Sequence, residues 1–331
     1  IALAAGCLLW TFRLRLFLPP PEGAGDSLHL IEHIPVYTQL FGFLDSFDEP
    51  LELFLRSRIY LLFNDAGIGV DLAYAIISTI AGSIYTAGLL FFLRGKDLRS
   101  ALLALPILLL TPLLALFAGY VESYTLVTLT LTALLALTAH CAGKAPSSAE
   151  LMMLGGLAAL SFLLHGITAF ALPALIFLTF EKSSKVQDFW KNASAGGLAA
   201  AAFLLPAYAF FFLVVEYPIS ISESFALRPP ILSPLQWFEA EIVLGKLQSL
   251  IGAAPLLVPS LPLVAQRIWH WREMSASIRI LFIAWACYMV HFLVWNPIIG
   301  FPADRDLFSL FAISANFLLW YLYRESRQSW T

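Results

Sequence analysis

The chain has 331 residues, of which 60% are hydrophobic and only 12% are charged, and its mean hydropathy is +0.82. A soluble domain usually carries about 25% charged residues, so this composition excludes an ordinary water-soluble fold. A net charge of -3 and the lack of any basic stripe exclude nucleic acid as a partner. The three cysteines lie in apolar segments and indicate buried thiols rather than a disulfide framework. The sequence therefore predicts a polytopic membrane protein.

Apolar runs long enough to cross a bilayer recur along the chain. A helix needs about 18–20 apolar residues to cross the hydrocarbon core, and by this criterion we expect an all-α bundle of about ten transmembrane helices. Residues 1–331 are expected to form one transmembrane domain with no soluble domain. The helices in 100–140 and in 150–181 could instead be short hairpins that do not cross fully. The expected spans lie near 1–18, 70–93, 100–118, 120–140, 150–166, 167–181, 194–215, 248–266, 279–296 and 306–323.

A long connection, residues 19–69, follows the first expected span. Its segments LHLIEHIPVYTQLFGFL and EPLELFLRSRIYLLF place apolar residues at near-helical spacing. Such segments are typical of helices that lie in the membrane interface with one face buried among the headgroups. The first outer loop is therefore expected to carry amphipathic helices.

Lysine and arginine gather in one set of connections, which the positive-inside rule assigns to the cytoplasm. Most of the 19 basic residues fall there, including Lys96, Lys144 and Arg272, whereas most of the 22 acids fall in the opposite set. The 19–69 loop belongs to the acidic set. We therefore expect the potentially reactive acids to gather on the outer face.

The string GDSLHLIEH directly follows the first expected span. Asp26, His29 and His33 are spaced so that a helix starting there would align them on one face. A carboxylate beside two imidazoles could act as a general base or bind a divalent cation. The alternative is that Asp26 simply caps the helix, a position that favours Asp.

The string DEPLELFLRSRIY supplies the next candidates. Glu49 and Pro50 suit the start of a helix, because proline loses no hydrogen bond there and an acid favours the positive end of the dipole. Arg56 and Arg58 on the same helix could bind a phosphate or extend to the headgroups.

Further polar residues lie at the ends of later spans. Glu122, within GYVESY, is costly if it faces lipid, and so it is expected to face a cavity or to act as an interfacial acid. His165 could line the same cavity or serve in packing. In NPIIGFPADRDLF, Asp304 and Arg305 could form a surface pair, and Asp306 could cap the last span.

One observation favours a shared functional role for these residues over the separate structural explanation that each of them has. They come from distinct connections, yet the expected topology sends all of them to one face, where they would form an acidic pocket. The acids and histidine concerned are Asp26, Glu32, Glu49, Glu122, His165, Asp304 and Asp306. The sequence has no glycine-rich motif of the kind that binds nucleotide phosphates. A group-transfer substrate is therefore expected to arrive through the membrane on a lipid carrier.

The strings GDSLHLIEHI, DEPLELFLRSRIY, GYVESY and NPIIGFPADRDLF resemble those of poorly characterised bacterial members of the GT-C class of integral membrane glycosyltransferases. The resemblance also covers the long first outer loop and the functional face opposite the positive loops. It implies an enzyme of the bacterial inner membrane, with a periplasmic active face, that takes sugar from a polyprenyl-phosphate carrier. The other implied partners are membrane lipid and an acceptor that the sequence does not define.

By this resemblance Asp26 is the catalytic carboxylate, although the residue after it is Ser27 where the class often has a second acid. No cofactor is required by the resemblance, and a divalent cation (Mg²⁺ or Mn²⁺) is left open. Arg56, Arg58 and Arg305 could grip a lipid-linked phosphate. The full set of expected substrate-binding residues is Glu32, His33, Glu49, Arg56, Arg58, Glu122, His165, Asp304, Arg305 and Asp306.

Two functions of other classes also fit the composition. A transporter or lipid flippase usually carries ionisable residues near the bilayer midplane and two related halves, neither of which is evident here. A non-catalytic subunit of a membrane complex would use the same acids as interface contacts. Flux without a covalent product would favour the first, and stable co-purification with other membrane proteins would favour the second.

Overall fold

The structure is a computed structural model that describes residues 30–32, 34–35, 49–94, 107, 117, 121, 123–213, 231–295 and 305–328. Within these ranges the regular secondary structure is helical, and strand pairing is limited to one antiparallel bridge between Ile231 and Trp295. The helices are α3 (Pro50–Asn64), α4 (Val70–Leu93), α7 (Tyr124–Ala142), α8 (Ser148–Leu164), η1 (Gly166–Ala171), α9 (Leu172–Glu181), α10 (Val186–Leu213), η2 (Gln236–Phe238), α12 (Ala240–Ala253), α13 (Leu257–Trp269), η3 (Trp271–Glu273), α14 (Ala276–Val294) and α15 (Arg305–Gln328).

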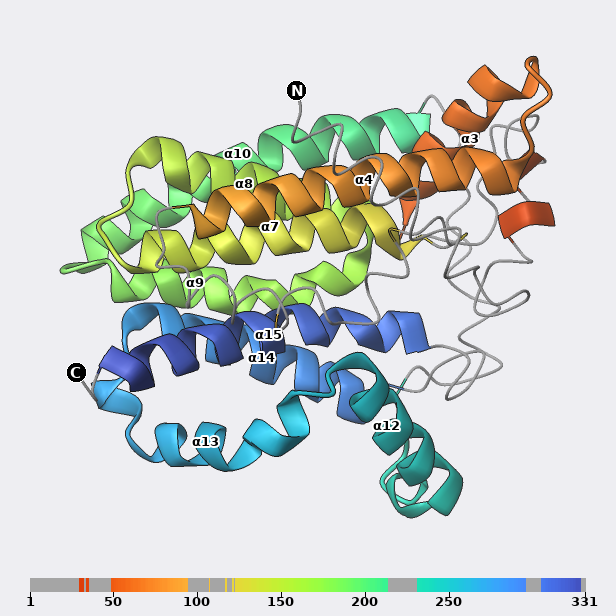
Figure 1. Ribbon diagram of the computed structural model, residues 1–331. Helices are drawn as coiled ribbons and strands as arrows, with labels where there is room; N and C mark the ends of the chain where they lie inside the picture. Colours follow the sequence, from red (N-terminus) through yellow and green to blue (C-terminus); the bar gives the residue numbers. More distant parts are fainter. Residues whose placement is uncertain are drawn as a thin grey trace.

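The long helices run roughly along one common direction, as the ribbon of Figure 1 shows for α4, α7, α8 and α15. Four helices in the described ranges are long and apolar enough to cross a membrane, namely α4, α7, α10 and α14. They coincide with the spans expected near 70–93, 120–140, 194–215 and 279–296. The expectations for 1–18 and for most of 100–118 lie outside the described residues.

The span expected near 248–266 is bent. Helices α12 and α13 pass the span test only together, and they meet at an angle of 89°. Pro255 lies in the break between them, where its missing N–H and its ring disfavour a continuous helix. In Figure 1, α13 follows the direction of the bundle while α12 turns away from it.

The expected spans near 150–166 and 167–181 are short apolar helices in the structure. A capping box starts α8: the Ser147 side chain accepts from the Glu150 backbone N–H, and the Glu150 carboxylate accepts from the Ser147 N–H at 2.9 Å. Helix α8 ends at His165, and η1 and α9 continue the chain back across the bundle.

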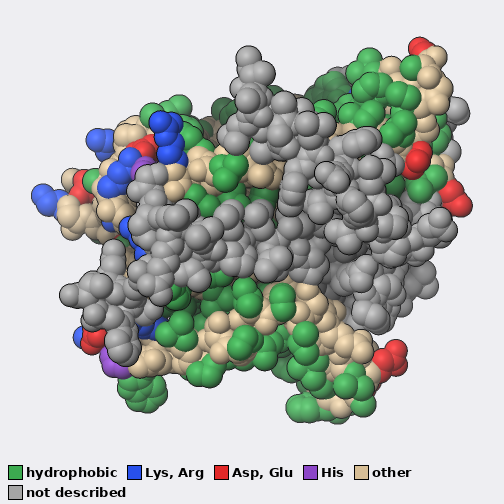
Figure 2. Space-filling model, viewed as in Figure 1, with side chains coloured by type: hydrophobic (Ala, Val, Ile, Leu, Met, Phe, Trp, Pro, Cys, Tyr) green, Lys and Arg blue, Asp and Glu red, His purple; other side chains and the backbone are tan. Residues whose placement is uncertain are grey.

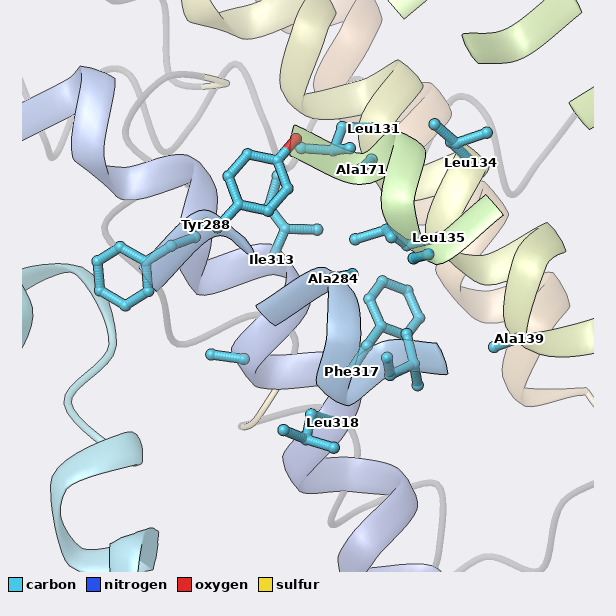
Figure 3. Packing of buried hydrophobic residues seen from close by; sticks show 14 of the residues in the cluster. Leu131, Leu134, Leu135, Ala139, Ala171, Ala284, Tyr288, Ile313, Phe317 and Leu318 are labelled. Carbon is cyan, nitrogen blue, oxygen red and sulfur yellow. The ribbon is translucent and has the colours of Figure 1, made fainter. Parts of the chain in front are cut away.

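The main hydrophobic core lies where α7, α14 and α15 pack together. Figure 3 shows Leu131 and Leu135 of α7 beside Ala284 of α14 and Phe317 of α15. The middle of α15 is almost wholly enclosed, with Trp320 only 1% exposed. Because dispersion and close packing drive helix association in lipid, this dense contact is the main source of cohesion in the bundle.

Helix α10 packs on α8 through glycine. A Cβ atom at Gly155 would lie 2.0 Å from the carbonyl oxygen of Gly196, so only glycine allows the two backbones to come this close.

Charged side chains divide between the two ends of the bundle. In Figure 2, Lys and Arg gather, with some acids among them, at the end that holds the 143–147 turn and the C-terminus, whereas the charged side chains visible at the opposite end near α3 are acids. This division agrees with the separation of basic and acidic connections expected from the sequence.

Candidate functional site

Helix α3 carries the acids of the candidate site. Pro50 occupies the first turn, which its fixed φ angle favours, and Glu49 stands at the N-cap position. The side chains of Glu52 and Arg56 are enclosed where α3 packs on neighbouring helices, whereas Leu62 is 78% exposed. The side chains of Glu52 and Arg56 therefore face the neighbouring helices, and Leu62 faces outward, as an apolar side chain at a lipid boundary would.

His165 lies at the joint between two helices. It is the C-cap of α8 and the N-cap of η1, and its extended backbone (φ -164°, ψ 127°) turns the chain between them. Its Nδ1 accepts a hydrogen bond from the backbone N–H of Ile167 at 3.2 Å. Since Nδ1 is an acceptor, the neutral imidazole carries its proton on Nε2.

The proton-bearing Nε2 faces an acid and a phenol. It lies 3.1 Å from Oε1 of Glu49 and 3.3 Å from the hydroxyl of Tyr124. The Tyr124 and His165 rings are stacked, with centroids 5.1 Å apart. His165 and Tyr124 are 3% and 4% exposed. The three side chains thus form a buried acid, imidazole and phenol cluster that joins α3, α7 and α8.

A second pair lies one turn further along α3. Nε of Arg56 donates to Oε1 of Glu52 at 2.8 Å, and both side chains are fully buried. The Arg56 guanidinium also lies 4.3 Å from the centroid of the Tyr74 ring on α4, a distance suited to a cation–π contact. The pair therefore anchors α3 to α4.

Burial raises the pKa of Glu52 to about 7, because desolvation of the carboxylate outweighs the attraction of Arg56. Glu52 Oε2 and Arg56 Nη2 have no hydrogen-bond partner within the described residues. A buried ion pair with unsatisfied atoms gains little net stability, which favours a role in holding geometry.

The arrangement can accept and donate protons. A carboxylate that accepts from an imidazole N–H, with a phenol beside it, is a usual setting for general acid–base chemistry. Among the described residues no three His, Cys, Asp or Glu side chains converge on a possible metal position.

The structure joins two of the residues proposed from the sequence, Glu49 and His165. Arg56 is only 1% exposed, so it does not extend to the headgroups, and that interpretation is wrong. Glu32 lies on the surface, and Arg58 is half-buried with its guanidinium 5.3 Å from the Phe54 ring centroid.

The remaining candidates are not placed. Asp26, His33, Glu122 and Asp304 lie outside the described residues, and Arg305 and Asp306 belong to the first turn of α15, where only the backbone is described.

Sequence reasoning missed Glu52 and the contact of Tyr124 with His165. The spacing of Glu52, three residues after Glu49 and four before Arg56, places the three on one helix face and was the available signal. Tyr124 lies two residues after Glu122 in GYVESY, and nothing local in the sequence indicates its contact with His165.

No protein-family profile and no curated protein sequence matches the chain. The structure itself is informative: the described helices, with their four to five candidate membrane spans, form a helical fold that is similar to that of a solved structure.

The likeness is to the crystal structure of ArnT from Cupriavidus metallidurans bound to undecaprenyl phosphate. The two share a TM-score of 0.52 and 15% sequence identity, over 96% of this chain and 59% of the ArnT chain. The chain thus spans less than two thirds of the length of this neighbour, and the likeness is one of fold.

Proposed function

We propose that the chain is a membrane glycosyltransferase that takes a sugar from a polyprenyl-phosphate carrier. The observation that carries the proposal is the fold shared with ArnT, a protein bound to undecaprenyl phosphate in its crystal structure. The buried cluster of Glu49, His165 and Tyr124 supports it, because it supplies acid–base groups at the acidic end of the bundle.

The proposed reaction is an inverting transfer. An acceptor hydroxyl oxygen forms a bond to the anomeric carbon while the bond from that carbon to the phosphate oxygen breaks. The polyprenyl phosphate departs with the bonding electron pair, and Asp26 takes or orients the proton of the hydroxyl. This role for Asp26 is inferred from the resemblance of its motif to the GT-C class.

Other residues are assigned to binding and positioning. Glu49 and His165 would orient the acceptor or the sugar by hydrogen bonds, and Arg58 and Arg305 would bind the carrier phosphate, since a guanidinium fork matches a phosphate geometrically. The remaining proposed pocket residues are Glu32, His33, Glu122, Asp304 and Asp306. Dependence on a divalent cation is tested by adding a chelator, which would abolish the activity of a metal-dependent enzyme.

The proposed setting is the inner membrane of a bacterium with the site on the periplasmic face. The acidic end of the bundle would be that face, and the basic end would face the cytoplasm. The acceptor would be a lipid, glycan or protein.

The test uses a product common to every donor of this kind. The full chain is reconstituted in liposomes with a panel of undecaprenyl-phosphate-linked sugars, and release of undecaprenyl phosphate is followed by mass spectrometry with membrane extracts as the acceptor source. We expect release with the wild type and at least about a hundredfold less with Asp26→Asn, because a general base contributes about 10²–10⁴ in rate.

Asp71→Asn is the matched control, because Asp71 is an exposed acid in the first turn of α4, away from the cluster. Equal release by the wild type and Asp26→Asn would overturn the role of Asp26. Movement of intact carrier across the liposome, with no sugar transferred for any donor, would overturn the enzyme and favour a flippase.

A further inference from the structure

A groove of about 670 Å³ opens between α4, α7 and α15. This volume is within the range of about 300–1,000 Å³ that is typical of ligand sites. Its described walls are mostly apolar, with Leu89 and Phe92 on α4, Leu137 on α7 and Phe317 on α15. The groove thus has the surface of a site for a hydrocarbon chain.

Small residues make room for the groove along its length. Gly88 on α4 and Ala133 and Ala136 on α7 line it, and a Cβ at Gly88 would meet no atom within 4 Å. Tyr85 also lines the groove and stacks on Phe117, with ring centroids 4.9 Å apart. Small residues and aromatic rings therefore share the described lining of the groove.

The length of the groove matches one leaflet of a bilayer. It follows α7 from Leu129 to Gly143, the C-cap residue, which at 1.5 Å per residue is about 21 Å. Half of a bilayer of about 40–45 Å, headgroup regions included, is also about 21 Å. Since α4 and α7 are candidate spans, the groove runs along the direction in which they would cross the membrane.

Polar groups gather where the groove reaches the basic end of the bundle, which we call its mouth. His140 and Arg324 line it there, beside the hydroxyl of Ser277, which already donates to the Ala139 carbonyl at 2.8 Å. No Asp or Glu is among the described lining residues. The nearby Glu150 lies 3.9 Å from His140 Nε2 and is bound by Lys144 at 2.6 Å, which offsets its charge. The mouth favours an anion.

We propose that this groove binds an anionic phospholipid from the leaflet at the basic end of the bundle. One acyl chain lies in the groove between α4, α7 and α15, and the phosphate group lies against Arg324 and His140. Charge complementarity at the mouth and the single-leaflet length together select this occupant over a soluble anion or a neutral lipid.

The groove is separate from the candidate functional site. Tyr124 belongs to that site and His140 to the mouth of the groove, and the two are 16 residues apart on α7, which corresponds to about 24 Å. The lipid site therefore does not depend on the proposed glycosyl transfer.

The experiment uses the purified full chain in a mild detergent with phosphatidylglycerol and phosphatidylcholine added in equal amounts, and native mass spectrometry counts each retained lipid. The wild type should retain phosphatidylglycerol in preference. Arg324→Gln should weaken that retention about fivefold and leave phosphatidylcholine unchanged, because one basic residue at a membrane surface contributes roughly this factor. His140→Gln should also weaken the retention of phosphatidylglycerol, because it removes a second polar group from the mouth of the groove.

Arg272→Gln is the matched control, since Arg272 is an exposed arginine in η3 at the basic end of the bundle but outside the groove. Ala136→Phe, which fills the groove, should reduce retention of phosphatidylglycerol while the thermal unfolding midpoint shows that the bundle is intact. Equal retention of the two lipids by the wild type, or equal loss in Arg324→Gln and Arg272→Gln, would overturn the site. Displacement of phosphatidylglycerol by inorganic phosphate would show that a free anion is the ligand instead.

Discussion

At the scale of single residues, the candidate site depends on which side chains meet. The sequence predicts a functional role for Glu49 from its place at the start of a helix in the first outer loop and for His165 from its place at a span end, and the structure brings them within 3.1 Å. Their direct contact could not be predicted, because one sequence without an alignment holds no information on which loops converge. Tyr124 and Glu52 were missed for the same reason: their importance lies in tertiary contacts.

We expect Glu49→Gln to lower the transfer rate by about tenfold or more, because a neutral amide accepts weaker hydrogen bonds than a carboxylate does from the His165 N–H and from the substrate hydroxyl that Glu49 would orient. The rate of undecaprenyl phosphate release measures the effect. Glu241→Gln, at an exposed acid in the first turn of α12, is the control. An unchanged rate in Glu49→Gln would remove this cluster from the reaction.

The raised pKa of Glu52, which lies on α3 outside the candidate spans, predicts that the stability of the protein depends on pH. Its pKa is raised from 4.5 to about 7, so between these values the folded protein holds a proton that the unfolded chain has released. Stability should therefore fall as the pH rises from about 5 to about 7, and should level off above that. Glu52→Gln should remove this slope. Thermal unfolding followed by tryptophan fluorescence across this range measures it, and parallel slopes in both proteins would contradict the assignment.

At the scale of elements, the hydropathy pattern located helices well and their breaks poorly. The span expected at 70–93 coincides with α4 at Val70–Leu93. By contrast, the span expected at 248–266 is two helices at 89°. Hydropathy averages over a window and so does not register a local break, although Pro255 is a visible signal for one. The turn at His165 was placed correctly, because the apolar run ends there.

The contact between α8 and α10 predicts opposite effects for two glycines. Gly155→Ala should destabilise the bundle by about 1–3 kcal/mol, since its Cβ would lie 2.0 Å from the Gly196 carbonyl oxygen. Gly197→Ala, on α10 with no atom within 4 Å, should be neutral or stabilising by up to about 1 kcal/mol, because alanine favours helix. Unfolding midpoints in one detergent compare the two, and equal midpoints would mean that the helices do not approach so closely.

At the scale of the whole molecule, composition alone determined the class of environment and the division of charge. A helical bundle with its exposed Lys and Arg gathered at one end follows from hydropathy and the positive-inside rule, and Figure 2 shows this gathering for the described residues. The number of spans remains a prediction, since four to five of about ten are supported by length and composition of the described helices. The fold shared with ArnT shows a likeness of architecture over 96% of this chain, and the family assignment drawn from the short motifs stays a prediction.

The position of His165 has a mechanical consequence. The nitrogen that accepts from the Ile167 N–H to start η1 is the same atom that would receive a second proton. Charging the imidazole would therefore break the cap of η1, so a proton arriving at this residue would loosen the joint between α8 and α9. His165 is both the cap of η1 and the acid–base group. A proton that reaches it during a reaction would therefore also free this corner of the bundle to move.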